Sequence, residues 1–249
     1  MINVLSVQNL GKSFGRNRVL DGVSFDIAEG EVAAVVGPSG AGKTTLLRIV
    51  AGLDGTFDGT VAISGVNYND YFRSGRVAIV PQQYSNFPWL TVERNLLEAL
   101  LHRQISMRNK KALIERQLAA VGLSGYEAHY PGQLSGGMQQ RVALSRALLQ
   151  QEPLICFDEP FSALDFLNRN ALQDLVRQRI QAEHKTALFV SHDIEEALYI
   201  SDRLLVLRDG KIVADVLRSF ARSVDQSIKN TSAFIELKAH IIDVMTTSL

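Results

Sequence analysis

Residues 32–45 decide the fold, and they read Val32-Ala-Ala-Val-Val-Gly37-Pro-Ser-Gly-Ala-Gly-Lys43-Thr-Thr45. Val32 to Val36 is a short apolar run, which is typical of a buried parallel strand. A glycine-rich turn follows, and the segment from Lys43 to Ala51 has apolar residues at helical spacing. The stretch therefore predicts a strand, a loop and a helix in direct succession. Its loop matches the phosphate-binding pattern G-x-x-x-x-G-K-[ST].

The chemistry of this loop follows from its residue types. Glycines let the backbone wrap closely round a phosphate, because a Cβ would block the approach. The loop N–H groups and the N-terminus of the helix both present positive charge to an anion. Lys43 adds a full charge for the β- and γ-phosphates, and Thr44 offers a hydroxyl to Mg²⁺. A chance glycine-rich turn is the alternative, and the flanking strand and helix count against it.

A second candidate segment is the apolar run from Leu154 to Phe157, which leads into two adjacent acids. A buried strand that ends in a carboxylate places Asp158 beside the Mg²⁺. Glu159 then lies where a water attacks the γ-phosphate, as a general base or a water-orienting group. Strands that end in acids are common, so this signal depends on the phosphate loop upstream. Together the two segments predict hydrolysis of a nucleoside triphosphate.

A third segment, Leu134 to Arg141, reads LSGGMQQR. Ser135 is a good N-cap, and an ordinary helix start is the simpler interpretation. Two glycines are nevertheless a poor choice for a first helical turn unless the backbone must approach something closely. The segment thus predicts a second helix end that can hold an anion.

The remaining segments predict strands that alternate with helices, and hence a mostly parallel sheet. The polar, charged stretch from Val92 to Val121 predicts two helices, and a third is expected from Gly136 to Leu149. Strands are expected at Asn3 to Leu10, Val23 to Ile27, Val61 to Ile63, Val77 to Val80 and Ala187 to Val190, with turns at Gly11, Gly15 and Asp21-Gly22. Helices are expected at Asn168 to Glu183 and Ile194 to Ile200, and a hairpin at Leu204 to Leu207 and Lys211 to Val213. In the tail, Phe234, Leu237, Ile241 and Met245 are expected to line one packed helix face.

Composition excludes several classes of protein. The 249 residues are 46% hydrophobic, which suffices for a sizeable core, and Lys+Arg and Asp+Glu both number 26. The net charge is therefore zero, and these totals do not indicate a basic surface of the kind that binds nucleic acid. The single cysteine, Cys156, permits neither an internal disulfide nor a cysteine zinc cluster and fits a reducing cytosol. The N-terminus does not resemble a signal peptide, and there is no run of about 18 apolar residues to span a bilayer.

The three motifs together resemble those of the ABC ATPases. LSGGMQQR resembles the family's signature sequence and is highly specific to it, GPSGAGKTT resembles Walker A, and LICFDEP resembles Walker B with its catalytic Glu. The resemblance covers residues 1 to about 215. It implies one ABC ATPase domain over residues 1–249, with an α/β P-loop NTPase core of the RecA-like type (1–85 and 151–215) and a mostly parallel sheet. An N-terminal antiparallel β subdomain, an inserted helical signature subdomain (86–150) and a C-terminal tail (216–249) complete the expected organisation.

Further segments carry the resemblance to the smaller motifs. Ser162 to Asp165 resembles the D-loop, Ser191 to Asp193 the switch-histidine segment, and Val80 to Gln82 the Q-loop. Phe14 falls where the family has an adenine-stacking aromatic, although packing is an alternative for any one such residue. The resemblance implies nucleotide contacts by Phe14, Gly37, Pro38, Ser39, Gly40, Ala41, Gly42, Lys43, Thr44, Thr45, Ser135, Gly136, Gly137 and Asp165. It implies Mg²⁺ contacts by Thr44, Gln82 and Asp158, and catalytic roles for Glu159, His192 and Gln82.

The resemblance also implies partners. In the family, ATP is held between Walker A of one subunit and the signature helix of another, so a homodimer or a paired ABC subunit is expected. Phe87 and Trp89 follow the Q-loop, where the family binds the coupling helix of a membrane subunit. Two permease subunits, a periplasmic or lipid-anchored solute-binding protein and a peripheral place on the cytoplasmic face of the membrane are therefore expected.

The sequence looks most like the ATPases of the nitrate/sulfonate/taurine-type importers, and those of thiamine-precursor-type importers are similar. A soluble or non-importer ABC ATPase, for iron–sulfur assembly or for lipoprotein or export machinery, is the alternative.

Overall fold

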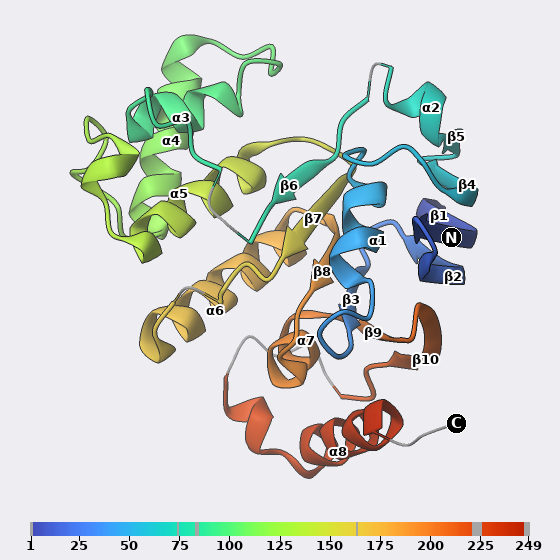
Figure 1. Cartoon of the computed structure of the whole chain (residues 1–249). Coiled ribbons are helices and arrows are strands. Elements are labelled where there is room, and N and C mark those ends of the chain that lie inside the picture. The colour runs from blue at the N-terminus through green and yellow to red at the C-terminus, as the bar shows by residue number, and fades with distance from the viewer. Residues whose placement is uncertain (1, 74, 83–84, 163, 221–225, 247–249) are drawn as a thin grey trace. The chain divides into compact units, whose positions relative to one another are not determined.

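The protein is described here by a computed structural model covering residues 2–73, 75–82, 85–162, 164–220 and 226–246. The chain divides into two compact units (Figure 1). The sheet unit comprises Met1–Ile79, Glu152–Glu159 and Ile180–Leu249, and the helical unit comprises Val80–Gln151 and Pro160–Arg179. Each unit is described by itself.

The sheet unit contains most of the strands. Its elements are β1 (Asn3–Phe14), β2 (Asn17–Ala28), β3 (Val32–Val36), α1 (Lys43–Val50), β4 (Asp58–Ile63), β5 (Val66–Asn67), α2 (Tyr68–Tyr71), β7 (Leu154–Asp158), β8 (Thr186–Val190), α7 (Ile194–Ile200), β9 (Arg203–Arg208), β10 (Lys211–Leu217), η2 (Gln226–Asn230) and α8 (Ser232–Thr246). The helical unit holds α3 (Val92–Glu98), α4 (Met107–Ala120), η1 (Pro131–Gln133) and α5 (Gly136–Leu149). Two elements, β6 (Ala78–Val80) and α6 (Phe166–Ala182), cross the division.

The larger sheet confirms the predicted mostly parallel arrangement, with the strand order β10-β9-β3-β8-β7-β6. β3 pairs in parallel with both β8 and β9, and β7 pairs in parallel with β8. All residues of β3, β7 and β8 are buried, as their continuous apolar runs predict. On one face of this sheet, the rings of Phe157 and Phe189 stack with centroids 4.2 Å apart. β7 and β8 are therefore joined by side chains as well as by their backbone ladder.

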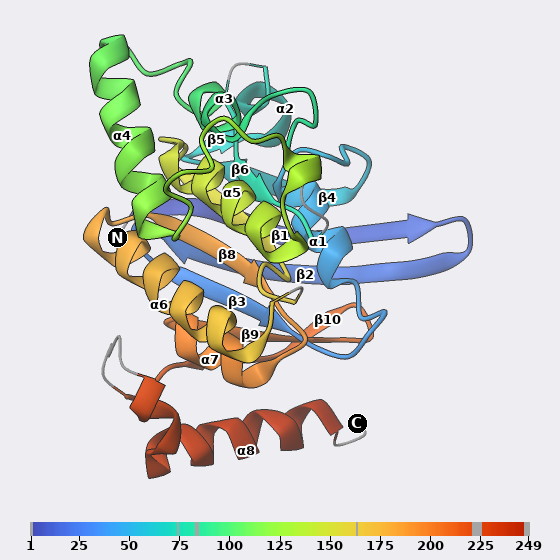
Figure 2. The ribbon, with the colours of Figure 1, turned by 90° about the vertical axis from the view of Figure 1, so that its left-hand side faces the viewer.

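The second sheet is antiparallel, with the order β2-β1-β4-β5, and β1 and β2 form a long ribbon (Figure 2). The prediction of turns at Gly11 and at Asp21-Gly22 is wrong, because both lie inside these strands. Leu10 pairs with Val23 and Lys12 pairs with Leu20, so Asp21 and Gly22 together oppose Gly11. This is a β-bulge, in which Gly22 adopts a φ of 71° that other residues rarely accept. The ribbon thereby continues to the turn at Gly15.

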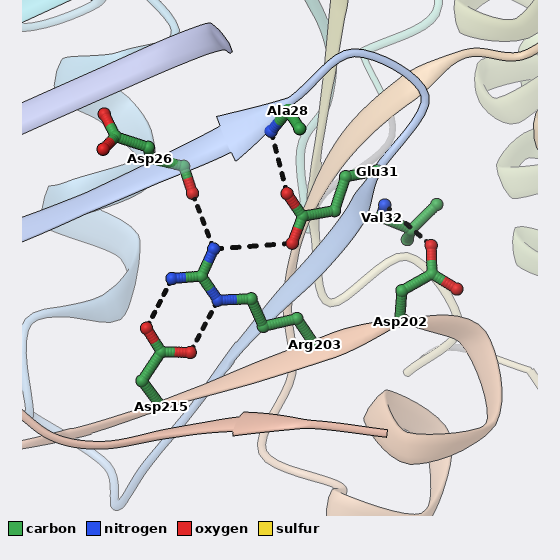
Figure 3. A network of polar contacts seen from close by, with 7 residues as sticks. All are labelled: Asp26, Ala28, Glu31, Val32, Asp202, Arg203 and Asp215. Carbon is green, nitrogen blue, oxygen red and sulfur yellow. Dashed lines mark hydrogen bonds and ion pairs between the residues drawn. The ribbon is translucent and has the colours of Figure 1, made fainter. Parts of the chain in front are cut away.

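A network of polar contacts centred on Arg203 joins β9 and β10 to β2 (Figure 3). The guanidinium holds the Asp215 carboxylate with two donors, donates to the carbonyl oxygen of Asp26 at 3.0 Å, and lies 3.5 Å from Oε1 of Glu31. The bidentate contact with Asp215 raises the pKa of Arg203 above its ordinary value. The network fixes the edge of the parallel sheet against the antiparallel ribbon.

The helical unit contains the two helices predicted between Val92 and Val121, which are α3 and α4. α5 has the predicted bounds, and α3, α4 and α5 pack against one another. Thr91 and Ser106 cap α3 and α4 by accepting hydrogen bonds from the backbone N–H groups of Arg94 and Asn109. The inserted helices therefore form a small bundle with its own apolar interior.

The C-terminal segment forms η2 and α8, and α8 lies beside α7 in both ribbon views (Figures 1 and 2). Of the residues predicted to line one packed helix face, Phe234 and Ile241 are buried, whereas Leu237 and Met245 are only half-buried. Within the described ranges, no helix combines the length and apolar character that crossing a bilayer requires.

Candidate nucleotide-binding and catalytic site

The phosphate loop connects the buried end of β3 to the start of α1. Gly40 and Gly42 adopt φ values of 82° and 102°, which suit glycine, and Gly42 is the N-cap of α1. Gly42 has no side chain that could cap the first N–H groups of the helix, so no side-chain cap competes with an anion for these donors. A Cβ on Gly37 would stand 2.0 Å from the carbonyl oxygen of Leu207, so this glycine is also required by packing.

Lys43 is held across the loop. Its ammonium donates to the carbonyl oxygens of Gly37 at 2.8 Å and Pro38 at 2.9 Å, and the residue is only 7% exposed. Burial lowers the pKa of Lys43, and the negative charges of Glu159 and Asp158 act in the opposite direction. The charge is thus placed inside the loop before any anion arrives.

Asp158 and Thr44 supply oxygen donors at the end of β7. The hydroxyl of Thr44 lies 3.5 Å from Oδ1 of Asp158. Burial raises the pKa of Asp158, and the neighbouring negative charge of Glu159 raises it further. One hydroxyl and one carboxylate suit Mg²⁺, which keeps water and phosphate oxygens as its remaining ligands. In the described part of the chain no three His, Cys, Asp or Glu residues are grouped as a metal site.

Glu159 and His192 meet where β7 and β8 end. Oε1 of Glu159 lies 3.0 Å from Nδ1 of His192. Glu159 has a φ of 46°, which is uncommon for a residue with a side chain and costs about 1 kcal/mol or more. Its N–H donates to the carbonyl oxygen of Val190 at 2.9 Å, and this hydrogen bond holds the left-handed turn in place. The turn directs the carboxylate to the histidine.

The backbone on either side of His192 is anchored by α7. Asp193 is the N-cap of this helix and accepts hydrogen bonds from the N–H groups of Glu195 at 2.9 Å and Glu196 at 3.1 Å. The hydroxyl of Ser191 donates to Glu196 at 2.8 Å. The His192 side chain itself is 62% exposed. Its position is consequently determined by the backbone and by Glu159.

Phe14 lies at the end of β1 with 54% of its surface exposed. The ammonium of Lys12 lies 4.9 Å from the centroid of its ring. Lys12 is itself buried and donates to Asp54 at 2.7 Å and to the carbonyl oxygen of Thr56 at 2.6 Å. The phenyl ring is thus supported by an anchored cation and has surface free to stack on a planar group.

The helical unit carries the predicted signature residues. Ser135 is the N-cap of α5 and accepts from the N–H of Met138 at 3.3 Å. Ser135 is exposed and Gly136 and Gly137 are half-buried, so this helix end is open at the surface of its unit. A Cβ on Gly137 would come within 3.1 Å of the end of the Leu164 side chain.

Gln82 and Asp165 also belong to the helical unit, where Gln82 is exposed. Asp165 accepts from the N–H of Asn168 at 3.1 Å and from its side-chain amide at 2.6 Å. Arg141, the last residue of the signature segment, donates to Asn168, so the signature helix and the predicted D-loop are joined. Ala163, in the middle of the predicted D-loop, lies outside the described residues.

Two supporting residues escaped sequence reasoning. Lys12 resembles an ordinary surface residue of a strand, because its partners Asp54 and Thr56 are remote in the sequence. Asn95 is fully buried although polar, and it binds the loop before α3 through four hydrogen bonds with the backbone of Phe87, Leu90 and Thr91. In the sequence, Asn95 lies at helical spacing from apolar residues, and this pattern could have indicated that its side chain is buried.

Comparisons with known proteins show the family of the chain. Residues 20–162 match the ABC transporter family. An uncharacterised ABC transporter ATP-binding protein of Methanocaldococcus jannaschii is 40% identical over 247 residues, which is 97% of this chain and 91% of that protein. The aliphatic sulfonates import ATP-binding protein SsuB 3 of Nocardia farcinica is 44% identical over 88% of this chain and 83% of its own length. A homologue of the same name in Pseudomonas aeruginosa, SsuB 1, is 41% identical over 91% of both chains.

Solved structures agree as well. A dimeric, post-hydrolysis ATP-binding cassette, MJ0796, bound to ADP and Pi, matches with a TM-score of 0.77 and 31% identity, over 87% of this chain and all of that one. The fold and the phosphate loop define an ATPase of the cassette type. The chain belongs to the ABC transporter family as one of its ATP-binding, ATP-hydrolysing subunits.

Proposed function

We propose that this subunit powers solute import through a partner membrane permease by closing, with ATP, into a head-to-tail dimer. The observation that carries the proposal is the presence in one chain of a phosphate loop with a nearby Glu159–His192 pair and, in the other unit, an open signature helix end. The similarity to proteins named for import of aliphatic sulfonates supports the direction of transport.

In the proposed reaction, the loop from Gly37 to Thr45 wraps the phosphates and Lys43 neutralises the β- and γ-phosphates. Thr44 and Asp158 are the residues that would hold Mg²⁺, with Gln82 proposed as a further ligand, and the ion would supply positive charge that neutralises the phosphates. Phe14 stacks on the adenine. Because the Lys43 charge is already fixed by two loop carbonyls, little reorganisation accompanies binding.

Glu159 is proposed to accept a proton from, or to orient, the water that attacks the γ-phosphate. His192 holds the Glu159 carboxylate at 3.0 Å and contacts the γ-phosphate with its remaining ring nitrogen. The left-handed turn at Glu159 keeps the carboxylate at this edge of the sheet. The pair thus acts as one positioned unit.

The second half of each site is proposed to come from a second copy. Ser135, Gly136 and Gly137 of one subunit bind the γ-phosphate held by the other, and Asp165 lies at the same dimer interface. The start of α1, which has no side-chain cap, attracts the phosphates of the nucleotide. The exposed start of α5 in the second copy adds further N–H donors. Two copies arranged head to tail form two complete sites, and the dimeric cassette bound to ADP and Pi supports this assembly.

The loop at Phe87 and Trp89 is the proposed contact with the permease, and the subunit is proposed to bind at the cytoplasmic face of the membrane. Trp89 is 71% exposed, and Arg146 lies 4.4 Å from the centroid of the Phe87 ring. A rigid, exposed aromatic is the kind of side chain that anchors a partner helix. A solute-binding protein on the opposite side would deliver the cargo.

Co-expression with a membrane permease of the aliphatic sulfonate import type tests the proposal. Purified complex in liposomes is expected to take up an aliphatic sulfonate only with ATP inside the compartment that contains this subunit. Trp89→Ala is expected to reduce capture of the permease by about tenfold or more. Leu101→Ala, another exposed apolar residue of the helical unit, is the control and leaves capture unchanged. Purification with soluble proteins alone, or ATP-driven transport in the outward direction, would contradict import.

A further inference from the structure

The first turn of α7 is tied to the C-terminal segment by an ion-pair cluster made of Glu195, Lys229 and Lys238. The Lys238 ammonium, on α8, lies 2.8 Å from Oε2 of Glu195, and the Lys229 ammonium, at η2, lies 3.5 Å from Oε1. The hydrogen bond from Lys238 lowers the pKa of Glu195, and the charge of Lys229 adds to the effect. Lys229 also lies 5.0 Å from the ring centroid of Tyr199 on α7. Both lysines therefore hold the same short helix.

Buried apolar side chains of the C-terminal segment hold the two lysines beside Glu195, so the cluster is not a chance surface contact. Phe234 and Ile241 of α8 and Ile228 of η2 are buried in the sheet unit. Near the far end of α8, Arg208 donates to the carbonyl oxygen of Val244 at 2.9 Å. The C-terminal segment is thus anchored at several points, and the two lysines are its contacts with the charged first turn of α7.

The first turn of α7 begins next to His192, which has a proposed role in ATP hydrolysis. Asp193 caps α7, and the N–H of Glu195 is one of the two donors to that cap. His192 immediately precedes the cap, and its side chain is mostly exposed, so the backbone of this turn determines where the imidazole lies. A shift of the turn would move His192 relative to Glu159.

We infer that Lys229 and Lys238 are positioning residues for ATP hydrolysis: by clamping Glu195 they let the C-terminal segment fix the start of α7 and, through it, His192. The inference depends on the proposed role of His192. In the proposed function the nucleotide is held by the phosphate loop that precedes α1, whereas the contacts described for the two lysines are with Glu195 and Tyr199 of α7. Loosening the clamp should therefore affect the chemical step and leave ATP affinity unaltered.

The test measures steady-state ATP hydrolysis by the full-length chain and a Lys229→Met/Lys238→Met double variant. Methionine keeps the length and apolar stem of lysine and removes the charge. We expect kcat to fall by about threefold to tenfold, below the roughly 100-fold that a 1 Å misplacement can cost, while KM for ATP stays within about twofold. Lys238→Arg, which keeps the ion pair, should retain most of kcat. Lys211→Met, which removes an exposed pair with Asp21 elsewhere in the sheet unit, is the matched control.

A double-mutant cycle with His192→Ala separates positioning from general loosening of the fold. If the clamp acts through His192, the double lysine variant has little further effect in the His192→Ala background. An equal fold-loss in both backgrounds, or an unchanged kcat in the double variant while His192→Ala alone is slow, overturns the clamp and leaves the proposed function intact. If His192→Ala itself hydrolyses ATP at the original rate, the proposed role of His192 and the clamp both fail.

Discussion

Nδ1 of His192 lies 3.0 Å from Oε1 of Glu159, although the two residues follow different strands. They meet because β7 and β8 are neighbouring parallel strands, in which Asp158 pairs with Val190. The carboxyl ends of parallel strands share one edge of the sheet, where ligands of open α/β folds bind. The register of two buried strands therefore assembles this pair.

Replacing Glu159 by Gln is expected to lower kcat by about 10²-fold to 10⁴-fold, because the amide cannot accept a proton from water at neutral pH. Binding of ATP should persist, since the phosphate loop is intact. The variant should accumulate as a closed dimer when ATP is added, as measured by size-exclusion chromatography with light scattering. Glu29→Gln, at an exposed position of the same unit, serves as the control. Hydrolysis at the original rate would refute the catalytic assignment.

Replacing Lys43 by Met should weaken ATP binding by about tenfold to 100-fold, which corresponds to loss of a charge-assisted hydrogen bond. Isothermal titration with a non-hydrolysable ATP analogue measures the change, and Lys111→Met, on the exposed side of α4, controls for the loss of one surface charge. Thermal unfolding without nucleotide should be recorded as well, because Lys43 also bonds to Gly37 and Pro38. Equal affinities for variant and wild type would rule out the phosphate-loop assignment.

Replacing Gly37 by Ala should lower the free energy of unfolding by about 1–3 kcal/mol, the usual cost of overpacking. The reason is steric, since the added Cβ would stand 2.0 Å from the carbonyl oxygen of Leu207. Gly55→Ala is the matched control, because there the new Cβ meets Tyr68 at an ordinary 3.6 Å. Urea unfolding of both variants distinguishes them; equal stabilities would mean that the loop moves aside without cost.

Replacing Phe14 by Ala should raise KM for ATP by about twofold to tenfold, the range expected when one aromatic contact is lost, with kcat nearly unchanged. Phe14→Tyr should preserve KM, since the tyrosine ring also stacks. Val66→Ala removes another exposed apolar side chain of the sheet unit and should alter neither constant. An unaltered KM in Phe14→Ala would leave the residue with no role in base stacking.

The Lys12–Asp54 pair predicts a pH-dependent contribution to stability. The hydrogen bond from Lys12 lowers the pKa of Asp54, and a backbone hydrogen bond from Thr56 lowers it further. A carboxyl whose pKa is lower in the folded than in the unfolded state stabilises the fold above the unfolded value of about 3.9, and this contribution disappears as the pH falls through the folded pKa.

Asp54→Asn should therefore unfold at a lower urea concentration than wild type at pH 7, and the difference should shrink as the pH falls below about 4. Asp70→Asn is the control, because its pair with Arg73 is exposed and exposed pairs contribute little. If the difference in urea midpoint between Asp54→Asn and wild type stays constant from pH 7 to pH 3, the Lys12–Asp54 pair does not stabilise the fold in the proposed way.

Local signals in the sequence predicted the elements whose causes are local. β3 and α5 have the predicted bounds because an apolar run and an N-cap serine mark them directly. The bulge at Gly22 was missed, since it depends on the register of β2 against β1. α2 was missed because it has four residues and no apolar period, and its Tyr68 is held by edge contacts with Phe57 and Phe72.

The candidate site divides in the same way. The phosphate loop and Asp158 could be found from spacing alone. The contact between Glu159 and His192 could not, because it depends on the pairing of β7 with β8. The clamp on Glu195 depends likewise on where α8 packs, and no local pattern encodes that.

Asn95 has a thermodynamic consequence for the permease contact proposed at Trp89. Its amide occupies the backbone carbonyls of Phe87, Leu90 and Thr91, so the loop that presents the indole is already ordered in the free subunit. Fixing one residue's backbone costs about 1–2 kcal/mol, and a loop ordered during folding does not incur that loss again at encounter. When a partner binds at this surface, the loop of this subunit should therefore lose little conformational entropy. Most of the entropy lost on binding would then come from the partner.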